Sequence, residues 1–373
     1  MSNAIDYLDW RGDVKFDAAP FNEIDAVICS KLTSLDFTGI VPAEGGAALR
    51  DAVDAYFERY GDRDVRLGVL LAPGAVTMVK KMLASPRFDG LSIHDYINRV
   101  DSGNTEQFCA MTLELPDGTH YVAFRGTDDT IAAWREDFNM SYSDAVPAQR
   151  DAADYLCRAM ERFGGKFRVG GHSKGGNLSV FAAMKAPEQF QERILNVYNF
   201  DGPGFRESVK NDPGYMRIRG KIRMFVPQHS LVGVLLVNDS PYEIIETNET
   251  GMAAHNAYTW QVLGPRFVRC DKFSLRTRVY RDAMRAWADS LEPEERQKLI
   301  NAVFDALEST GARTLTDLTE QRVRKAASAA RDLLGDEHER AVFTESMELL
   351  ARAYISSARN TLPIINHFQR RKK

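Results

Sequence analysis

The sequence has few cysteines, no long apolar run and no strong excess of charge of either sign. Its 373 residues include four cysteines, which lie far apart and form no C-x-x-C pair: Cys29, Cys109, Cys157 and Cys270. This spacing argues against a zinc site and against a disulfide framework, so we expect no bound metal and a reducing, cytoplasmic setting. An apolar run such as LVGVLLV, residues 231–237, is far too short to span a bilayer.

The net charge and the N-terminal residues limit the classes of protein to which the chain can belong. A net charge of -4 gives no reason to expect nucleic acid as a partner. The opening MSNAIDYLDWRGD has acidic residues where a secretory signal would have a basic start and an apolar core, so no export signal is expected. The composition, 44% hydrophobic and 27% charged, is that of a soluble globular protein. The length allows one large α/β domain with additions, or two domains.

The most informative stretch is residues 167–186, FRVGGHSKGGNLSVFAAMKA, which reads as a strand, a tight turn and a helix. Ser173 lies at the turn within Gly171 to Gly175, the G-x-S-x-G pattern of a nucleophile elbow, in which a sharp turn exposes the serine hydroxyl. A chance match, or a glycine-rich turn that serves only packing, is the alternative. A phosphate-binding loop fits worse because Lys174 is followed by glycine, not by Ser or Thr.

The segments around this elbow alternate between strands and helices. Amphipathic helices are predicted within residues 20–60 and at 148–163, and single strands at 194–200 and 222–226. Period-two patterns at 108–115 and 120–124, separated by Pro-Asp-Gly, predict a β-hairpin. Together they predict an α/β fold with a mainly parallel sheet covered by helices on both faces, with ligands bound at the carboxyl ends of its strands. Residues 67–97 are mixed and leave their structure open.

Beyond about Phe273 the pattern becomes helical throughout. One apolar stripe contains Leu299, Val303 and Leu307, and a second runs from Phe343 to Tyr354. We therefore predict a core formed by residues 1–272, including N-terminal helices, and a C-terminal helical appendage formed by residues 273–373.

Two motifs in this order resemble the class 3 lipases of the α/β-hydrolase superfamily, and look closest to a largely uncharacterised bacterial branch of that family. One is YVAFRGT at residues 121–127, with Trp134 and Asp137 downstream; the other is GHSKGGNL at 171–178. The resemblance covers roughly residues 67–262 and implies an α/β-hydrolase fold with Ser173 as nucleophile. It also implies an oxyanion hole made by the backbone N–H groups of Thr127 and Lys174.

A serine nucleophile needs a base, and in this fold the chain order is Ser, then Asp or Glu, then His. The histidines after Ser173 are His229, His255, His338 and His367. His255 is favoured because it follows the last predicted sheet strands and precedes the helical appendage, where the catalytic histidine of the family falls. His229 comes one strand too early, and the other two lie in the tail. A structural or merely exposed histidine is the alternative for His255.

The acid departs from the family pattern. Class 3 lipases usually carry it after the strand that corresponds here to residues 222–226, but Pro-Gln-His-Ser follows that strand. Asp201, at the end of the preceding strand, is the substitute, and Asp239 is the fallback. Asp201 could instead be a turn residue that bonds its own backbone.

Three neighbouring features have simpler interpretations. Trp134 is expected to be a packing anchor, and Asp137 a carboxylate that holds the Arg125 loop. The side chain of Lys174 is expected to reach solvent. Residues 231–237 are expected to be a plain buried strand or helix, with an acyl pocket lining or a lid as the alternative.

The sequence thus favours a serine hydrolase of the lipase or esterase type, which cleaves an acyl ester through a Ser173–His255–Asp201 triad and an acyl-enzyme intermediate. Its expected partner is a small-molecule or lipid acyl ester, without a metal or an organic cofactor. An acyltransferase or thioesterase would use the same triad. A non-catalytic α/β-hydrolase domain that serves as a binding or scaffold protein is the alternative from a different class, and the displaced acid keeps it open.

Overall fold

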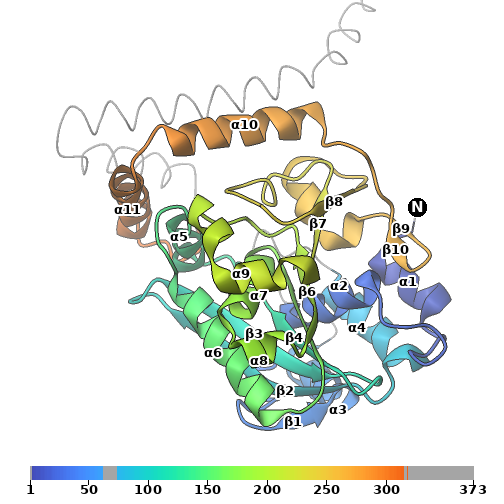
Figure 1. Ribbon diagram of the computed structural model, residues 1–373. Coiled ribbons are helices and arrows are strands. Elements are labelled where there is room, and N and C mark those ends of the chain that lie inside the picture. Colours follow the sequence, from blue (N-terminus) through green and yellow to red (C-terminus); the bar gives the residue numbers. More distant parts are fainter. Residues whose placement is uncertain (1, 62–73, 315–316, 318–373) are drawn as a thin grey trace, which may run out of the picture.

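The centre of the protein is an eight-stranded sheet whose strands are neighbours in chain order, from β1 to β8 (Figure 1). The computed structural model describes residues 2–61, 74–314 and 317. The strands are β1 (Gly46–Ala48), β2 (Ser92–Asp101), β3 (Glu106–Glu114), β4 (His120–Phe124), β5 (Phe167–His172), β6 (Ile194–Phe200), β7 (Ile222–Pro227) and β8 (Tyr242–Ile245). The pairs from β1 to β4 are antiparallel and those from β4 to β8 are parallel. This arrangement confirms the predicted α/β fold with a mainly parallel sheet.

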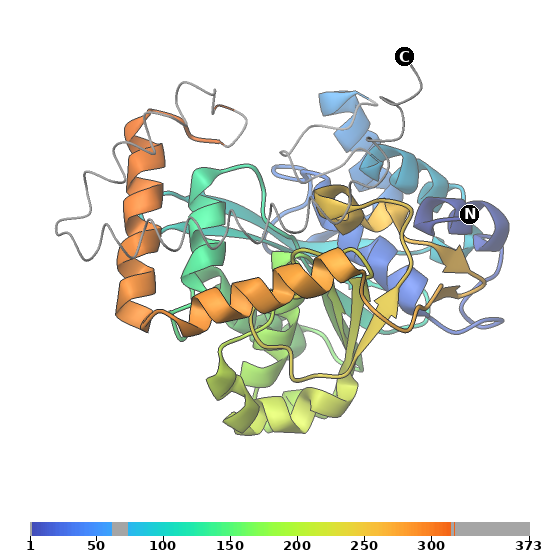
Figure 2. The same cartoon turned by 90° about the horizontal axis from the view of Figure 1, so that it is seen from above.

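Helices cover both faces of this sheet, as Figure 2 shows from above. They are α1 (Ala4–Arg11), α2 (Glu23–Lys31), α3 (Leu49–Tyr60), α4 (Ala75–Leu83), α5 (Ile131–Asn139), α6 (Pro147–Arg162), α7 (Lys174–Lys185), α8 (Glu188–Gln191), α9 (Pro213–Ile218), α10 (Leu275–Asp289) and α11 (Pro293–Ser309). Strand β4 shows why two layers form. Its alternate residues Tyr121 and Ala123 join a core with α1 to α4, whereas Val122 and Phe124 join a core with α6, α7 and α9.

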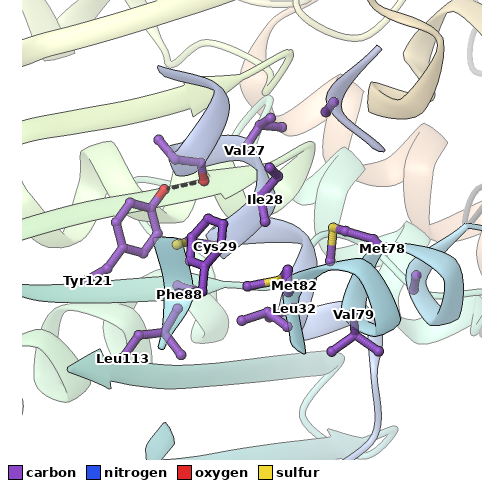
Figure 3. Packing of buried hydrophobic residues seen from close by; sticks show 14 of the residues in the cluster. Val27, Ile28, Cys29, Leu32, Met78, Val79, Met82, Phe88, Leu113 and Tyr121 are labelled. Carbon is purple, nitrogen blue, oxygen red and sulfur yellow. Dashed lines mark hydrogen bonds between the residues drawn. The ribbon is translucent and has the colours of Figure 1, made fainter. Parts of the chain in front are cut away.

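The packing of the N-terminal helices is drawn in Figure 3. Val27 and Ile28 of α2 lie near Met78 and Met82 of α4, and the hydroxyl of Tyr121 on the sheet reaches back toward α2. That hydroxyl donates to the Ala26 carbonyl oxygen at 3.0 Å. Helices α1 to α4, which precede strands β2 to β8 in the sequence, therefore cover this face of the sheet.

The predicted hairpin is present, since β3 and β4 pair across a turn at Gly118. Of the stretch at 67–97 that the sequence left open, residues 74–97 hold α4 and the first part of β2. Strand β2 contains a register shift between His94 and Ile97, with Asp95 at φ 54°, and this irregularity breaks the period-two pattern. Residues 62–73 lie outside the described part.

The prediction of a buried strand or helix at residues 231–237 is wrong, because these residues form neither. They lie in turns between β7 and β8, and within them only Gly233 and Val234 are buried. The amide of Gly233 donates to the Asp201 carboxylate at 3.0 Å, so a side chain rather than a neighbouring strand takes this backbone group.

Helices α10 and α11 follow the core, and α11 lies beside α5 in Figure 2. Arg135 on α5 pairs with Asp305 at 2.8 Å, and the rings of Phe138 and Phe304 contact at a tilt of 57°, with centroids 5.6 Å apart. The second predicted stripe, Phe343 to Tyr354, lies outside the described residues, so the extent of the appendage stays a prediction. No helix among the described residues is long and apolar enough to cross a membrane.

Candidate active site

Ser173 lies between β5, which ends at His172, and α7, which begins at Lys174. Its backbone has φ 60° and ψ -132°, a strained conformation for a residue other than glycine. Gly175 makes the turn possible: a Cβ there would lie 2.1 Å from the carbonyl oxygen of Phe124. The sequence thus folds locally as the strand, elbow and helix that the motif predicts, and Ser173 is 7% exposed.

Asp201 and His255 meet beside this elbow. Asp201 follows β6 directly and is fully buried, and His255 ends a short 3₁₀ helix, Gly251–His255. His255 Nδ1 lies 2.6 Å from Asp201 Oδ2. Because β5 and β6 are adjacent parallel strands, their carboxyl ends place Ser173 and Asp201 at the same edge of the sheet.

The other oxygen of Asp201 is held by the loop that follows β7. Ser230 Oγ donates to Asp201 Oδ1 at 2.6 Å, and the Gly233 amide donates to the same oxygen at 3.0 Å. The loop in which the family pattern expects the acid therefore supplies donors to an acid on the neighbouring strand. The fallback, Asp239, points elsewhere and pairs with Arg219 at 3.1 Å.

The second ring nitrogen of His255, Nε2, is buried and has no hydrogen-bond partner among the described residues. The Ser173 hydroxyl therefore does not donate to it in this structure. Hydrogen bonds between a nucleophile and its base are often long without substrate and tighten in the complex. Nε2 is the one ring nitrogen of His255 still able to accept a proton if Nδ1–H donates to Asp201.

His172 packs against His255, with ring centroids 4.5 Å apart. Its Nε2 lies 2.7 Å from the His255 carbonyl oxygen. Burial lowers the pKa of His172 well below the usual 6.5, with smaller effects from His255 and Lys31, so the ring is neutral and Nε2–H donates. The sequence analysis did not predict this contact between His172 and His255. The feature that could have indicated it is the position of His172, directly before the serine of the elbow motif.

The loop predicted to supply an oxyanion donor lies against the elbow. A Cβ on Gly126 would lie 3.0 Å from Ser173 Cβ and 2.7 Å from the His172 carbonyl oxygen, so only glycine fits there. Thr127 follows it and is buried. Lys174 is the first residue of α7, where backbone N–H groups have no partner within the helix.

The prediction that the Lys174 side chain reaches solvent is wrong, because this side chain is fully buried. Its Nζ donates to Glu136 Oε2 and to the Gln107 carbonyl oxygen, both at 2.9 Å. Glu136 also accepts the amides of Gln107 at 3.1 Å and Ala148 at 2.8 Å. A buried carboxylate draws the ammonium inward, and nothing in the sequence pairs these two residues in advance.

Asp137 and Trp134 lie beside this ion pair, on α5. Asp137 Oδ2 accepts the Thr127 hydroxyl, and burial raises the pKa of Asp137 to about 7. Trp134 packs against a small cluster that includes Phe304 of α11. Arg125 donates to Asn98 at 2.9 Å. These contacts fit supporting roles for Trp134 and Asp137.

Among the described residues, no other histidine after Ser173 forms a hydrogen bond or an ion pair with Asp201. His229, in the loop after β7, is partly buried, and burial lowers its pKa. His338 and His367 lie outside the described residues. The described residues contain no group of three or more histidine, cysteine or acidic side chains able to hold a metal ion.

Two cavities lie away from the serine. One, of about 600 Å³, is near the amino ends of β6, β7 and β8, and the other, of about 300 Å³, lies near α7 and the loop at Gly204. Neither is lined by Ser173 or His255.

The sheet order, the elbow and the placement of Ser173 define an α/β-hydrolase fold of the lipase-like kind. The chain belongs to the Mbeg1-like family, whose model matches residues 82–305.

Solved structures give a weaker likeness. The Rhizomucor miehei lipase in its propeptide complex is 17% identical with a TM-score of 0.32, and the alignment covers 42% of this chain and 57% of that one. The M37 lipase is 14% identical with a TM-score of 0.35, covering 56% of this chain and 68% of that one. No curated protein matched the sequence. The fold assignment therefore depends on the sheet and the elbow.

Proposed function

We propose that the protein is a serine hydrolase that cleaves an acyl ester of a small molecule or a lipid. The observation that carries this proposal is the 2.6 Å contact between His255 Nδ1 and the fully buried Asp201, next to a serine in a strained elbow. Such an arrangement fixes one imidazole nitrogen as a donor and leaves the other as a base.

In the proposed reaction Ser173 Oγ attacks the acyl carbonyl carbon, and its proton passes to His255 Nε2. Asp201 holds the ring and stabilises the imidazolium that forms. The amides of Lys174 and Thr127 would bind the oxyanion, each donor contributing about 2.7–4 kcal/mol to the transition state. His255 then returns the proton to the leaving alcohol, and water hydrolyses the acyl-enzyme by the same steps in reverse. The chemistry needs no cofactor.

A second candidate is a non-catalytic binding or scaffold protein with this fold. It is favoured by one observation, that His255 Nε2 has no partner among the described residues and so receives no proton from Ser173. In such a protein the Asp201–His255 pair would serve only to hold the 3₁₀ helix that ends at His255.

A fluorophosphonate probe separates the two candidates, because it reacts with an activated serine. We expect wild-type protein and a Ser208→Ala control, which alters an exposed serine, to be labelled, and Ser173→Ala to remain unlabelled. A folded wild type that takes up no label would refute the hydrolase and support the binding protein. A series of chromogenic esters of increasing acyl length would then define the substrate class.

A further inference from the structure

The cavity of about 600 Å³ lies at the opposite end of the central strands from the serine. Its lining comes from the early residues of β6 and β7, from the segment before α2 and from the hairpin of β9 (Val262–Leu263) and β10 (Arg266–Phe267). Helix α1 and this hairpin are neighbours in Figure 1, and the Val262 amide donates to the Ser2 carbonyl oxygen at 2.8 Å. Asn196 of β6 lines the cavity, and Asp201 is five residues further, about 16 Å along an extended strand.

Both carboxylates on the cavity wall are already occupied. Glu23 accepts Arg269 Nη1 at 2.7 Å and Nη2 at 2.9 Å, and it also accepts the Phe267 amide at 2.8 Å. Glu243 accepts Arg269 Nε at 2.6 Å and Arg223 Nη2 at 3.0 Å. The acidic groups are therefore compensated by two arginines of the same wall, and they offer little to a cationic ligand.

Several donors on the wall, in contrast, have no partner among the described residues. Arg11 and Arg266 make no ion pair or side-chain hydrogen bond there; Nε of Arg11 is buried, and Arg266 is exposed. The Tyr198 hydroxyl also has no hydrogen-bond partner there, although Tyr198 is only 6% exposed. Burial raises the pKa of Tyr198 to about 12, so the phenol stays a neutral donor. The free groups are donors that could satisfy an acceptor-rich ligand.

Aromatic rings form a large part of the apolar lining of the cavity. Phe21, Tyr198 and Phe267 all line it, and the rings of Phe21 and Tyr198 have centroids 6.3 Å apart. A volume of about 600 Å³ lies within the range of small-molecule sites, which combine apolar walls with a few fixed polar groups.

We propose that this cavity is a second ligand site, distinct from the serine site, for a small molecule that joins a phosphate or carboxylate group to a planar ring. Arg11 and Arg266 bind the anionic group, because guanidinium groups pair well with such oxygens. The Tyr198 hydroxyl adds a neutral hydrogen bond, and the planar ring packs against the aromatic part of the wall. Nothing in this proposal depends on hydrolysis at Ser173.

Calorimetric titration of the full chain with phenyl phosphate tests the proposal. We expect binding of one molecule per chain, at least tenfold weaker in Arg11→Gln/Arg266→Gln and a few-fold weaker in Tyr198→Phe. Arg158→Gln removes one positive charge from an exposed position on α6 and should bind as the wild type does. Neither arginine side chain has a polar partner in the part of the chain that the structure describes, so their loss should leave the melting temperature without ligand unchanged.

Two further arms separate this site from the serine site and from simple anion binding. Ser173→Ala should bind phenyl phosphate with unchanged affinity, and inorganic phosphate should bind at least tenfold more weakly than phenyl phosphate. No binding to wild type at 10 mM phenyl phosphate overturns the proposal. So does unchanged affinity in the double arginine variant, loss of binding in Ser173→Ala, or equal affinity for inorganic phosphate.

Discussion

The Asp201–His255 pair and the cavity lie at opposite ends of the central strands, and they differ in the polar groups that have no protein partner among the described residues. In the pair, Asp201 accepts from Ser230 and Gly233, and the atom without a partner is His255 Nε2, which can accept a proton. In the cavity, Glu23 and Glu243 are occupied, and the groups without a partner are donors on Arg11 and Arg266. A site whose polar groups are all paired says little about its ligand, whereas an unpaired acceptor or an unpaired donor indicates which chemistry the site can support. One end suits proton transfer and the other suits an anion.

The two ends also differ in how they are built. The serine end is a set of strand and loop termini brought together by parallel pairing, and it is almost closed, with Ser173 only 7% exposed. The other end is a cavity whose wall includes segments from before α2 and from after β8. The following predictions test whether this difference is functional.

The largest effect is expected at the carboxyl end. If Asp201 orients His255, Asp201→Asn should lower kcat for ester hydrolysis by about 10⁴-fold, because the amide no longer fixes the required tautomer. Asp239→Asn is the matched control, since Asp239 pairs with Arg219 at the surface and should keep kcat within about twofold. Steady-state kinetics on a chromogenic ester measure both. A large loss in Asp239→Asn with none in Asp201→Asn would reverse the assignment.

The sequence could predict the serine end in part. The elbow was predictable because G-x-S-x-G imposes one local geometry, and His255 could be ranked by chain order. The supporting contacts were not predictable. Ser230 and Glu136 are ordinary residues whose partners lie 29 and 38 positions away, and only the fold brings them together. No motif marks the cavity at the other end, where Arg11 and Arg266 come from α1 and β10.

The next largest effect is a loss of stability on removing a buried ion pair beside the cavity. Arg87 and Asp25 form a fully buried pair, joined at 2.7 Å and 2.6 Å. Arg87 also donates to the carbonyl oxygens of Ala19 and Pro20, which line the cavity. Arg87→Met leaves Asp25 buried without its cation, so unfolding free energy should fall by about 3–5 kcal/mol.

Urea denaturation measures this change, and Arg162→Met is the control, because the pair of Arg162 with Asp95 is partly exposed and should contribute about 1 kcal/mol or less. Phenyl phosphate should protect wild type against urea and protect Arg87→Met less, since the cavity wall is displaced. Equal losses in the two variants would show that the buried pair contributes no more than a surface pair.

The sheet itself shows where sequence reasoning stops. The alternation of β3 and β4 and the strands β6 and β7 were predicted close to their observed bounds, because burial on a pleated face leaves a plain pattern. Strand β2 was not, since its register shift at Asp95 breaks the alternation. Residues 231–237 were assigned to regular structure because they are apolar, but their backbone serves Asp201 instead.

A smaller effect is expected from the buried ion pair behind the elbow. Lys174→Met removes the ammonium from Glu136, which keeps the amides of Gln107 and Ala148 as donors, so the loss should be about 2–3 kcal/mol. The backbone N–H of residue 174 would shift, and kcat should fall about tenfold, less than for removal of an oxyanion donor. Adding Glu136→Gln to Lys174→Met should recover part of the stability, as a double-mutant cycle would show. Purely additive losses would mean that the two side chains do not interact.

The smallest effect is a pH dependence at Asp137. Its folded-state pKa of about 7 lies above the usual value of 3.8, so between about pH 4 and 7 the folded protein holds a proton that the unfolded chain has lost. This group therefore adds stability at low pH that is lost as the pH rises to 7. As the pH rises through that window, the free energy of unfolding of Asp137→Asn should fall by less than that of wild type, by a difference on the order of 1–2 kcal/mol. The figure is modest because the carboxyl is partly exposed. Urea unfolding of both proteins at pH 4.5, 5.5, 6.5 and 7.5 gives the difference, in which the opposite contribution of His172 cancels. Parallel stability curves for the two proteins would show that Asp137 does not titrate in this range, and that the bond from Thr127 goes to a carboxylate at every pH tested.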